Sequence, residues 1–285
     1  MDFLIVLLLC TLATSKVTLQ SRFGKKTLST ASDNVLFNAI VFLTASMLFC
    51  TDIPKASTQT WVFALVFALL TVAFQLSYTK ALSLGNVSLT VMAVNLSMLF
   101  PSLVSLIFYD ESLTLTRIIG IILTVISFTL TVDLKFKEGF SRSWFILTSV
   151  TALANAGIGI TQKIFGASDV SGEKSSFVAC SYALAFLVTV TLYFSTRSKE
   201  IKQKSTKTAE TYIFAAAVGI ILSVFQWLNT YAITVMDGSF LFPVYSGGSI
   251  ILSTLVGILF FKDKLTKNQK ISITLGIIAV VIMNV

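Results

Sequence analysis

The segment "LVSLIFYDESLT" at residues 103–114 recurs in altered form as "LVGILFFKDKLT" at residues 255–266. Five of the twelve positions are identical, and several of the others keep the chemical character of the side chain. Self-similarity at a fixed, large separation indicates that a chain contains related structural units. The fold is therefore expected to be a duplication of one unit.

Two further pairs of segments support the duplication. Residues 79–88 ("TKALSLGNVS") match residues 230–239 ("TYAITVMDGS"), and residues 19–24 ("LQSRFG") match residues 161–166 ("TQKIFG"). The offsets between the copies are 142, 151 and 152 residues, and they rise along the chain, as a duplication followed by a few insertions would produce. The pattern predicts a first unit at residues 1–140 and a second at residues 141–285.

The composition indicates that both units lie in a membrane. Hydrophobic residues make up 55% of the 285 residues, charged residues 12%, and the mean hydropathy is +0.88; soluble domains average about 25% charged residues. A helix crosses the bilayer with roughly 20 mostly apolar residues. Ten such spans are predicted at residues 3–21, 34–50, 59–80, 87–109, 114–133, 143–165, 175–195, 210–234, 239–261 and 268–285.

The expected fold class is thus an all-α membrane protein with five spans in each unit. An odd number of spans places the second unit upside down relative to the first. Inverted repeats of this kind are common in secondary transporters, where they enclose a central site. The sequence therefore predicts ten transmembrane helices arranged as two inverted five-helix repeats.

Basic residues give the orientation and account for the net charge of +8. Sixteen of the 21 Lys and Arg residues lie in the loops after the first, third, fifth, seventh and ninth spans, and cytoplasmic loops carry the excess of such residues. This distribution predicts a multi-pass protein of the cell membrane with both termini outward, and it gives no nucleic-acid footprint. The apolar N-terminus resembles a signal peptide, but Asp2 is its only early charge, which favours a retained first helix.

Several kinds of chemistry are excluded or disfavoured by the sequence. The chain has no histidine, which excludes His-ligated metals and Ser-His catalysis. The segment "SGGS" contains Ser246 and Ser249, but no lysine is placed to activate them. The cysteines lie in apolar stretches and are interpreted as packing residues: Cys10, Cys50 and Cys180. We expect neither an enzyme nor a cofactor, and no channel-like rings of charge are visible.

The chain resembles the EamA-type members of the drug/metabolite transporter superfamily. The resemblance lies in the 5+5 duplication, in the turn at residues 81–86, and in the acidic-x-Leu-Thr segments at residues 111–114 and 263–266. It implies alternating access by two inverted repeats, with substrate held among spans one, three, four, six, eight and nine. It also implies cytosolic termini, contrary to the charge distribution, so both orientations remain open.

Polar side chains at equivalent positions of the two units are the main site candidates. Gln75 and Tyr78 in the third span correspond to Gln226 and Asn229 in the eighth. Residues three apart share a helix face, so each pair forms a polar stripe. Polar groups inside a membrane tend to face the bundle interior or a wet cavity, and we expect these four to bind substrate.

Other candidates have equally good structural explanations. Hydrogen bonding between helices would also explain the amides, and snorkelling to the interface would explain the lysine. The further substrate-binding candidates are Asn95, Asn155, Lys16, Gln20 and Gln162, with Trp227 and Tyr245 as aromatic walls. Pro243, Gly247 and Gly248 suggest a break in span nine, and Pro101 a weak point in span four, although a simple kink is the alternative.

The placement of carboxylates limits the substrate class. All Asp and Glu residues fall in loops or near span ends, so proton-coupled antiport of organic cations, which uses a buried acid, is disfavoured. We expect a small neutral, zwitterionic or anionic metabolite as partner, and a coupling ion or counter-substrate is compatible with this. The alternatives are an organic-cation exporter of the same superfamily and a membrane scaffold that transports nothing.

Overall fold

The structure is a computed structural model, and it describes most of the chain. The described residues are 2–27, 31–84, 90–91, 94–95, 97–109, 114–131, 141–197, 209–261, 267–268, 271, 274–275, 278–279 and 282. In this part of the chain all regular structure is helical and there is no strand. The prediction of an all-α fold is confirmed.

Helices occupy the first nine predicted spans. They are α1 (Asp2–Thr27), α2 (Ala31–Met47), the 3-10 helix η1 (Cys50–Lys55), α3 (Thr58–Leu84), α5 (Leu99–Phe108), α6 (Leu115–Thr131), α7 (Arg142–Gly166), α8 (Lys174–Arg197), α9 (Ala209–Val235) and α10 (Gly238–Phe261). The tenth predicted span, residues 268–285, falls largely outside the described residues. In the described part of the chain, five helices are long and apolar enough to cross a membrane, namely α1, α3, α7, α8 and α9.

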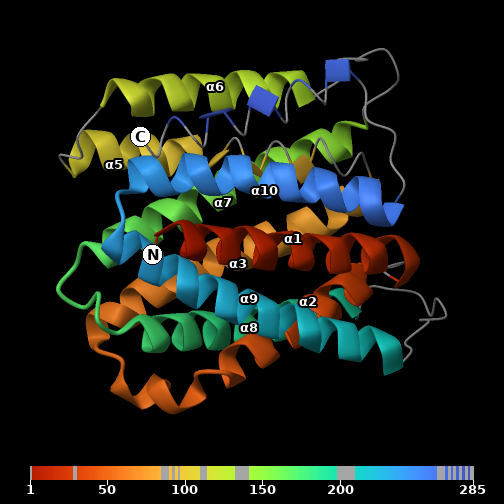
Figure 1. Cartoon of the computed structure of the whole chain (residues 1–285). Coiled ribbons are helices and arrows are strands. Elements are labelled where there is room, and N and C mark those ends of the chain that lie inside the picture. Colours follow the sequence, from red (N-terminus) through yellow and green to blue (C-terminus); the bar gives the residue numbers. More distant parts are fainter. Residues whose placement is uncertain are drawn as a thin grey trace.

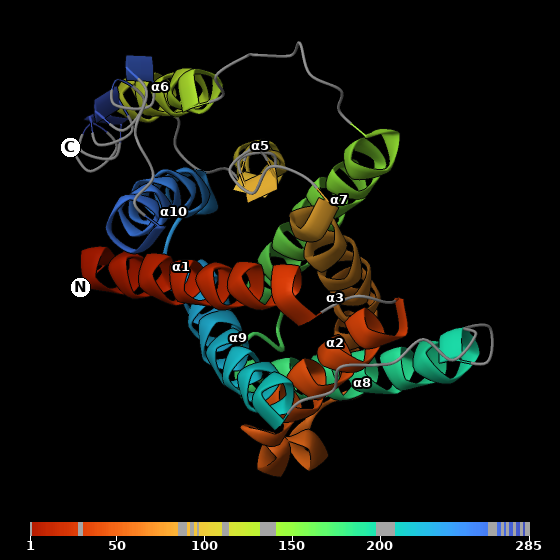
Figure 2. The same cartoon turned by 90° about the vertical axis from the view of Figure 1, so that its right-hand side faces the viewer.

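The helices run side by side in a bundle (Figures 1 and 2). The tightest packing joins helices that are far apart in sequence: α3 lies on α7, and α2 lies on both α8 and α9. Helix α1 packs between α9 and α10, and α5 packs on α10 and α7. Helices from the two predicted units are therefore interleaved, and each of the two hydrophobic core clusters contains residues from both units.

The outward faces of the bundle are apolar, as expected of a protein surrounded by lipid. On α3, Val62, Leu65, Val66 and Leu69 are exposed, and they recur at the three- and four-residue spacing of one helix face. Polar side chains of the same helix, including Gln75, are buried instead. This distribution is the reverse of that in a soluble protein, where exposed faces are polar, and it supports an integral membrane protein.

Two sequence-based expectations about helix breaks have different outcomes. Helix α10 is continuous through Pro243, so the predicted break in span nine is wrong, although the proline removes one i→i−4 hydrogen bond of the helix. In span four the helix is interrupted by a turn at Met98, whose N–H donates to the Asn95 carbonyl at 3.1 Å, and α5 begins at Leu99. Pro101 is the third residue of α5, so the interruption lies three residues before the predicted weak point.

The cysteines also differ from expectation. Cys10 and Cys180 are buried, as packing residues should be, but Cys50 is exposed. It begins η1, which the sequence indicated only as a short polar break between spans. The interpretation of Cys50 as a packing residue is therefore wrong, because helix α2 ends at Met47, before this residue.

Candidate functional site

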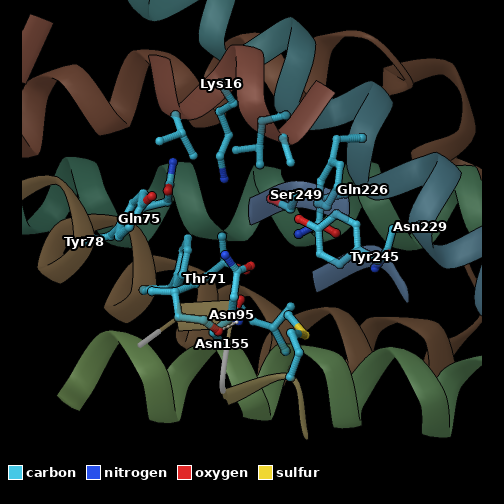
Figure 3. A pocket seen from close by; sticks show the side chains of 18 of the residues that line it. Lys16, Thr71, Gln75, Tyr78, Asn95, Asn155, Gln226, Asn229, Tyr245 and Ser249 are labelled. Atoms are coloured by element: carbon cyan, nitrogen blue, oxygen red, sulfur yellow. Dashed lines mark hydrogen bonds between the residues drawn. The ribbon is translucent and has the colours of Figure 1, made fainter. Parts of the chain in front are cut away.

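A cavity of about 70 Å³ lies at the centre of the bundle. A volume of this size can hold a few water molecules. It is enclosed by α1, α3, α7, α9 and α10 together with the segment around Asn95, so both predicted units contribute to its walls (Figure 3). Its lining combines several amide and hydroxyl side chains with aromatic rings.

Nine of the eleven predicted site residues line this cavity: Lys16, Gln75, Tyr78, Asn95, Asn155, Gln162, Gln226, Asn229 and Tyr245. Gln75 and Tyr78 lie on the opposite side of the cavity from Gln226 and Asn229 in Figure 3. The two polar stripes that occupy equivalent positions in the units thus face one space. Their role in binding a substrate remains a prediction.

The other two predicted residues, Gln20 and Trp227, do not line the cavity. Trp227 stacks on Tyr231 and Phe49, and its indole N–H donates to Ser175 Oγ at 3.0 Å. It joins helices outside the cavity. Gln20 is only 1% exposed, and neither carboxamide atom has a hydrogen-bond partner among the described residues.

Gln162 is the centre of a closed hydrogen-bond network between α7 and α9. Its Nε2 donates to Gln226 Oε1 at 3.1 Å and to Thr230 Oγ1 at 2.9 Å. Its Oε1 accepts from Asn229 Nδ2 at 2.9 Å. We call these four residues the α7–α9 network. Both ends of the Gln162 carboxamide are used, so the network joins the two helices as well as lining the cavity.

The α3 wall of the cavity is different, because its polar groups are unpaired. Gln75 is fully buried, and neither its Nε2 nor its Oε1 has a partner in the described part of the chain. The same holds for Thr71 Oγ1, one turn away, and for Asn95 Nδ2 in the segment before α5. Asn155, in contrast, donates to the Val94 carbonyl and to Ser97 Oγ, both at 3.0 Å. Unpaired buried polar groups are rare and call for an explanation.

Lys16 brings a positive charge to the cavity. Its side chain extends from α1 toward the centre in Figure 3, and the residue is only 8% exposed. The ammonium lies 5.3 Å from the centre of the Phe74 ring, within the range of a cation–π contact. The alternative that Lys16 snorkels toward the interface does not describe this conformation.

The structure adds lining residues that the sequence reasoning missed, chiefly Thr71, Ser249, Phe74, Phe225 and Phe242. Thr71 precedes Gln75 by one helical turn, so extending the predicted stripe backward would have found it. The phenylalanines gave no such signal, since the chain has 24 of them. Among the described residues no group of three or more Cys, Asp or Glu side chains could hold a metal ion.

Comparison with known proteins supports a transporter-like architecture. Residues 3–132 match the EamA-like transporter family. The match covers most of the first half of the chain. The predicted resemblance to EamA-type drug/metabolite transporters is thereby confirmed, and the matched segment contributes Lys16, Gln75 and Tyr78 to the cavity.

The fold extends beyond the matched half. A solved crystal structure, described only as that of a protein, has a TM-score of 0.76 to this chain and is 13% identical; the likeness covers 99% of this chain and 95% of the other. At this identity the likeness concerns the fold alone. No curated protein matches the chain.

Proposed function

We propose that the protein is a secondary transporter that carries a small polar metabolite through the central cavity by alternating access. The EamA family of its first half is a transporter family. The single observation that carries the proposal is the cavity itself, a buried polar space in the middle of an apolar bundle. Polar groups are costly at membrane depth and are retained where they line a path or a site.

We further propose that residues 1–140 and 141–285 are two inverted repeats. The helix contacts support this proposal because they come in pairs when the units are exchanged. In the proposed duplication α1, α2, α3 and α5 correspond to α7, α8, α9 and α10. The contact of α3 with α7 therefore corresponds to that of α9 with α1, and the contact of α2 with α9 to that of α8 with α3. Likewise α1 packs on α10 as α7 packs on α5. One unit present in two orientations gives a cavity that can open to either side.

Uptake by the purified protein in liposomes tests the proposal. We expect saturable uptake of a labelled small metabolite that an excess of the unlabelled compound suppresses. Ala13→Leu, which narrows the cavity, should reduce this uptake. The control Gly172→Ala should not, since an added methyl there has nothing within 4 Å. Flux that never saturates would indicate a channel, and absence of flux for every compound would favour the scaffold.

Labelling of Cys50 would decide the orientation in the cell membrane. Cys10 and Cys180 are buried, so a membrane-impermeant maleimide should react chiefly with the exposed Cys50 after the second span. The charge distribution predicts labelling from outside the cell. Labelling only after the membrane is opened would support the orientation with cytosolic termini, and Cys50→Ser provides the background.

A further inference from the structure

We infer that the cavity binds a monovalent organic anion, a carboxylate, for which Lys16 supplies the counter-charge. This inference rests on the proposed transport function and specifies its substrate class. It narrows the neutral, zwitterionic and anionic metabolites that the sequence left open to one charge type.

The first argument is the charge balance of the cavity. Lys16 is buried, and no Asp or Glu is among the residues that line the cavity in the described part of the chain. Moving an ammonium out of water costs several times what a cation–π contact returns. The Phe74 ring at 5.3 Å therefore does not offset the burial of Lys16. A bound anion would, because an opposite charge interacts strongly in a medium of low dielectric constant.

The same charge balance disfavours other ligands. A cationic ligand, or the ammonium of a zwitterion, would find no carboxylate in the described lining and would be repelled by Lys16. A phosphate monoester carries close to two negative charges at neutral pH. Lys16 is the only charged side chain in this lining, so one of those charges would remain uncompensated. One buried cation fits one negative charge.

The second argument is the set of unpaired donors near Lys16. Gln75 Nε2, Asn95 Nδ2 and Thr71 Oγ1 are buried and have no partner among the described residues. Figure 3 shows all three side chains around the space into which Lys16 extends. A carboxylate has two oxygens that together accept about four hydrogen bonds and donate none. It can therefore use the ammonium, both amides and the hydroxyl at once.

The third argument concerns the rest of the ligand. The cavity also has aromatic walls, formed by Phe74, Phe225 and Phe242 beside the polar groups. Small-molecule sites commonly combine apolar walls with a few polar groups that fix the orientation of the ligand. The geometry thus suits a carboxylate attached to a small apolar body.

Thermal stabilisation of the purified protein by probes of matched shape tests this inference. The probes are propionate and benzoate, their neutral amides, the corresponding amines, and phenyl phosphate as a dianion. We expect the carboxylates to raise the melting temperature most. Lys16→Met should weaken carboxylate binding roughly tenfold to a hundredfold, as expected for the loss of a hydrogen bond to a charged group, and Lys16→Arg should restore part of it.

Lys163→Met is the matched control. Lys163 is also 8% exposed, and its ammonium lies 5.1 Å from the Tyr109 ring, but it does not line the cavity. This variant should bind carboxylates like the wild type. Gln75→Glu provides a second measurement if Lys16→Met fails to fold: its carboxylate would occupy the place of the ligand anion and abolish carboxylate binding.

The outcomes separate this inference from the transport proposal. Stronger stabilisation by amides, amines or phenyl phosphate than by carboxylates would overturn the assignment, as would unchanged carboxylate binding in both Lys16→Met and Gln75→Glu. Uptake of a neutral probe into liposomes would then leave transport intact. If carboxylates bind through Lys16 but no probe of any charge crosses the liposome membrane, the transport proposal fails while the anion site stands.

Discussion

The two halves of the protein place similar polar residues at equivalent positions but use them differently. In the second half, the α7–α9 network pairs both ends of the Gln162 carboxamide with Gln226, Asn229 and Thr230. In the first half, the equivalent residues are Gln20 on α1 and Gln75, Tyr78 and Thr79 on α3, which we call the α1–α3 set. Neither Gln20 nor Gln75 has a carboxamide partner among the described residues.

The difference shows how one copy of a duplicated unit can hold helices together while the other copy keeps polar groups available for a ligand. A fully paired buried network holds helices together, whereas unpaired buried groups lower stability unless something else pairs with them. The α7–α9 network is thus suited to fixing one side of the cavity. Gln75 and Tyr78 of the α1–α3 set line the cavity with Lys16, so they are suited to contacting a ligand. Sites that bind ligands commonly give up some stability for this purpose.

The largest expected effect comes from removing the equivalent glutamines one at a time. Gln162→Leu leaves Asn229 Nδ2 and Gln226 Oε1 without their partner, and each unsatisfied buried group costs about 1–3 kcal/mol. Gln20→Leu removes two polar atoms that have no partner in the described part of the chain. We expect Gln162→Leu to lower the free energy of unfolding in detergent by about 2 kcal/mol and Gln20→Leu to leave it unchanged or raise it.

Each variant serves as the control for the other, since both replace a buried glutamine with leucine in a helix. Circular dichroism during thermal or denaturant unfolding would measure the difference. Equal losses of stability in the two variants would show that Gln20 is paired as strongly as Gln162 and that the two halves do not differ in this respect.

Most of this architecture could be predicted from the sequence, because membrane spans and duplication leave strong signals. An apolar run of about 20 residues has few alternatives to a spanning helix, and all the first nine predicted spans contain a helix. The repeat-related pairs Gln75–Tyr78 and Gln226–Asn229 were found by combining the duplication with helical spacing. All four residues line one cavity, as expected when the duplication and the helical spacing are combined.

What the sequence did not reveal depends on contacts between distant helices. The apolar run around Cys50 gave no sign that α2 ends at Met47 and leaves this residue exposed. Gln20 and Gln162 occupy equivalent positions in similar segments, yet only Gln162 lines the cavity and is paired. The difference depends on the side chains of the neighbouring helix, which is α3 for Gln20 and α9 for Gln162. A side chain's partner across a helix pair is not written in its local sequence.

A smaller effect isolates a single hydrogen bond of the α7–α9 network. Thr79 and Thr230 are equivalent, and each donates its hydroxyl to the carbonyl one turn earlier, at 2.6 and 2.8 Å. Only Thr230 Oγ1 also accepts from Gln162 Nε2. Valine replaces threonine with nearly the same shape, so Thr230→Val should cost more stability than Thr79→Val. The difference should be about 0.6 kcal/mol, the average for hydrogen bonds between membrane helices.

Comparing the two unfolding midpoints under identical conditions measures that difference, because the bond within the helix cancels. If Thr79→Val lowered stability more than Thr230→Val, the Thr79 hydroxyl would have to make a stronger hydrogen bond to another helix than Thr230 makes to Gln162. The α1–α3 set would then not lack such bonds between helices. A double variant with Gln162→Leu should remove the difference between the threonine positions.

The smallest effect concerns a hydrogen bond between the loop after α7 and the residue before α3, at the end of the molecule where α7 and α9 end. Glu173 lies beyond the end of α7, and its Oε2 accepts from the Ser57 N–H at 2.8 Å, just before α3 begins. Hydrogen bonds from the Thr60 hydroxyl and the Ser57 N–H lower the pKa of this carboxyl. A pKa lowered by folding stabilises the protein above the unfolded pKa of about 4.3, and this contribution is lost as the pH falls through the folded pKa.

We therefore expect Glu173→Gln to lower the free energy of unfolding at pH 7 by a few tenths of a kcal/mol, because the group is partly exposed and solvent weakens its interactions. The gap from the wild type should close as the pH falls below the folded pKa, since the wild-type carboxyl is then protonated too. Asp169→Asn, at an exposed position of the same loop, should show no gap at either pH. If the stability difference between Glu173→Gln and the wild type persisted at acidic pH, the side chain would act through its shape rather than its charge. The hydrogen bond from Ser57 to Glu173 would then owe nothing to the ionised carboxylate.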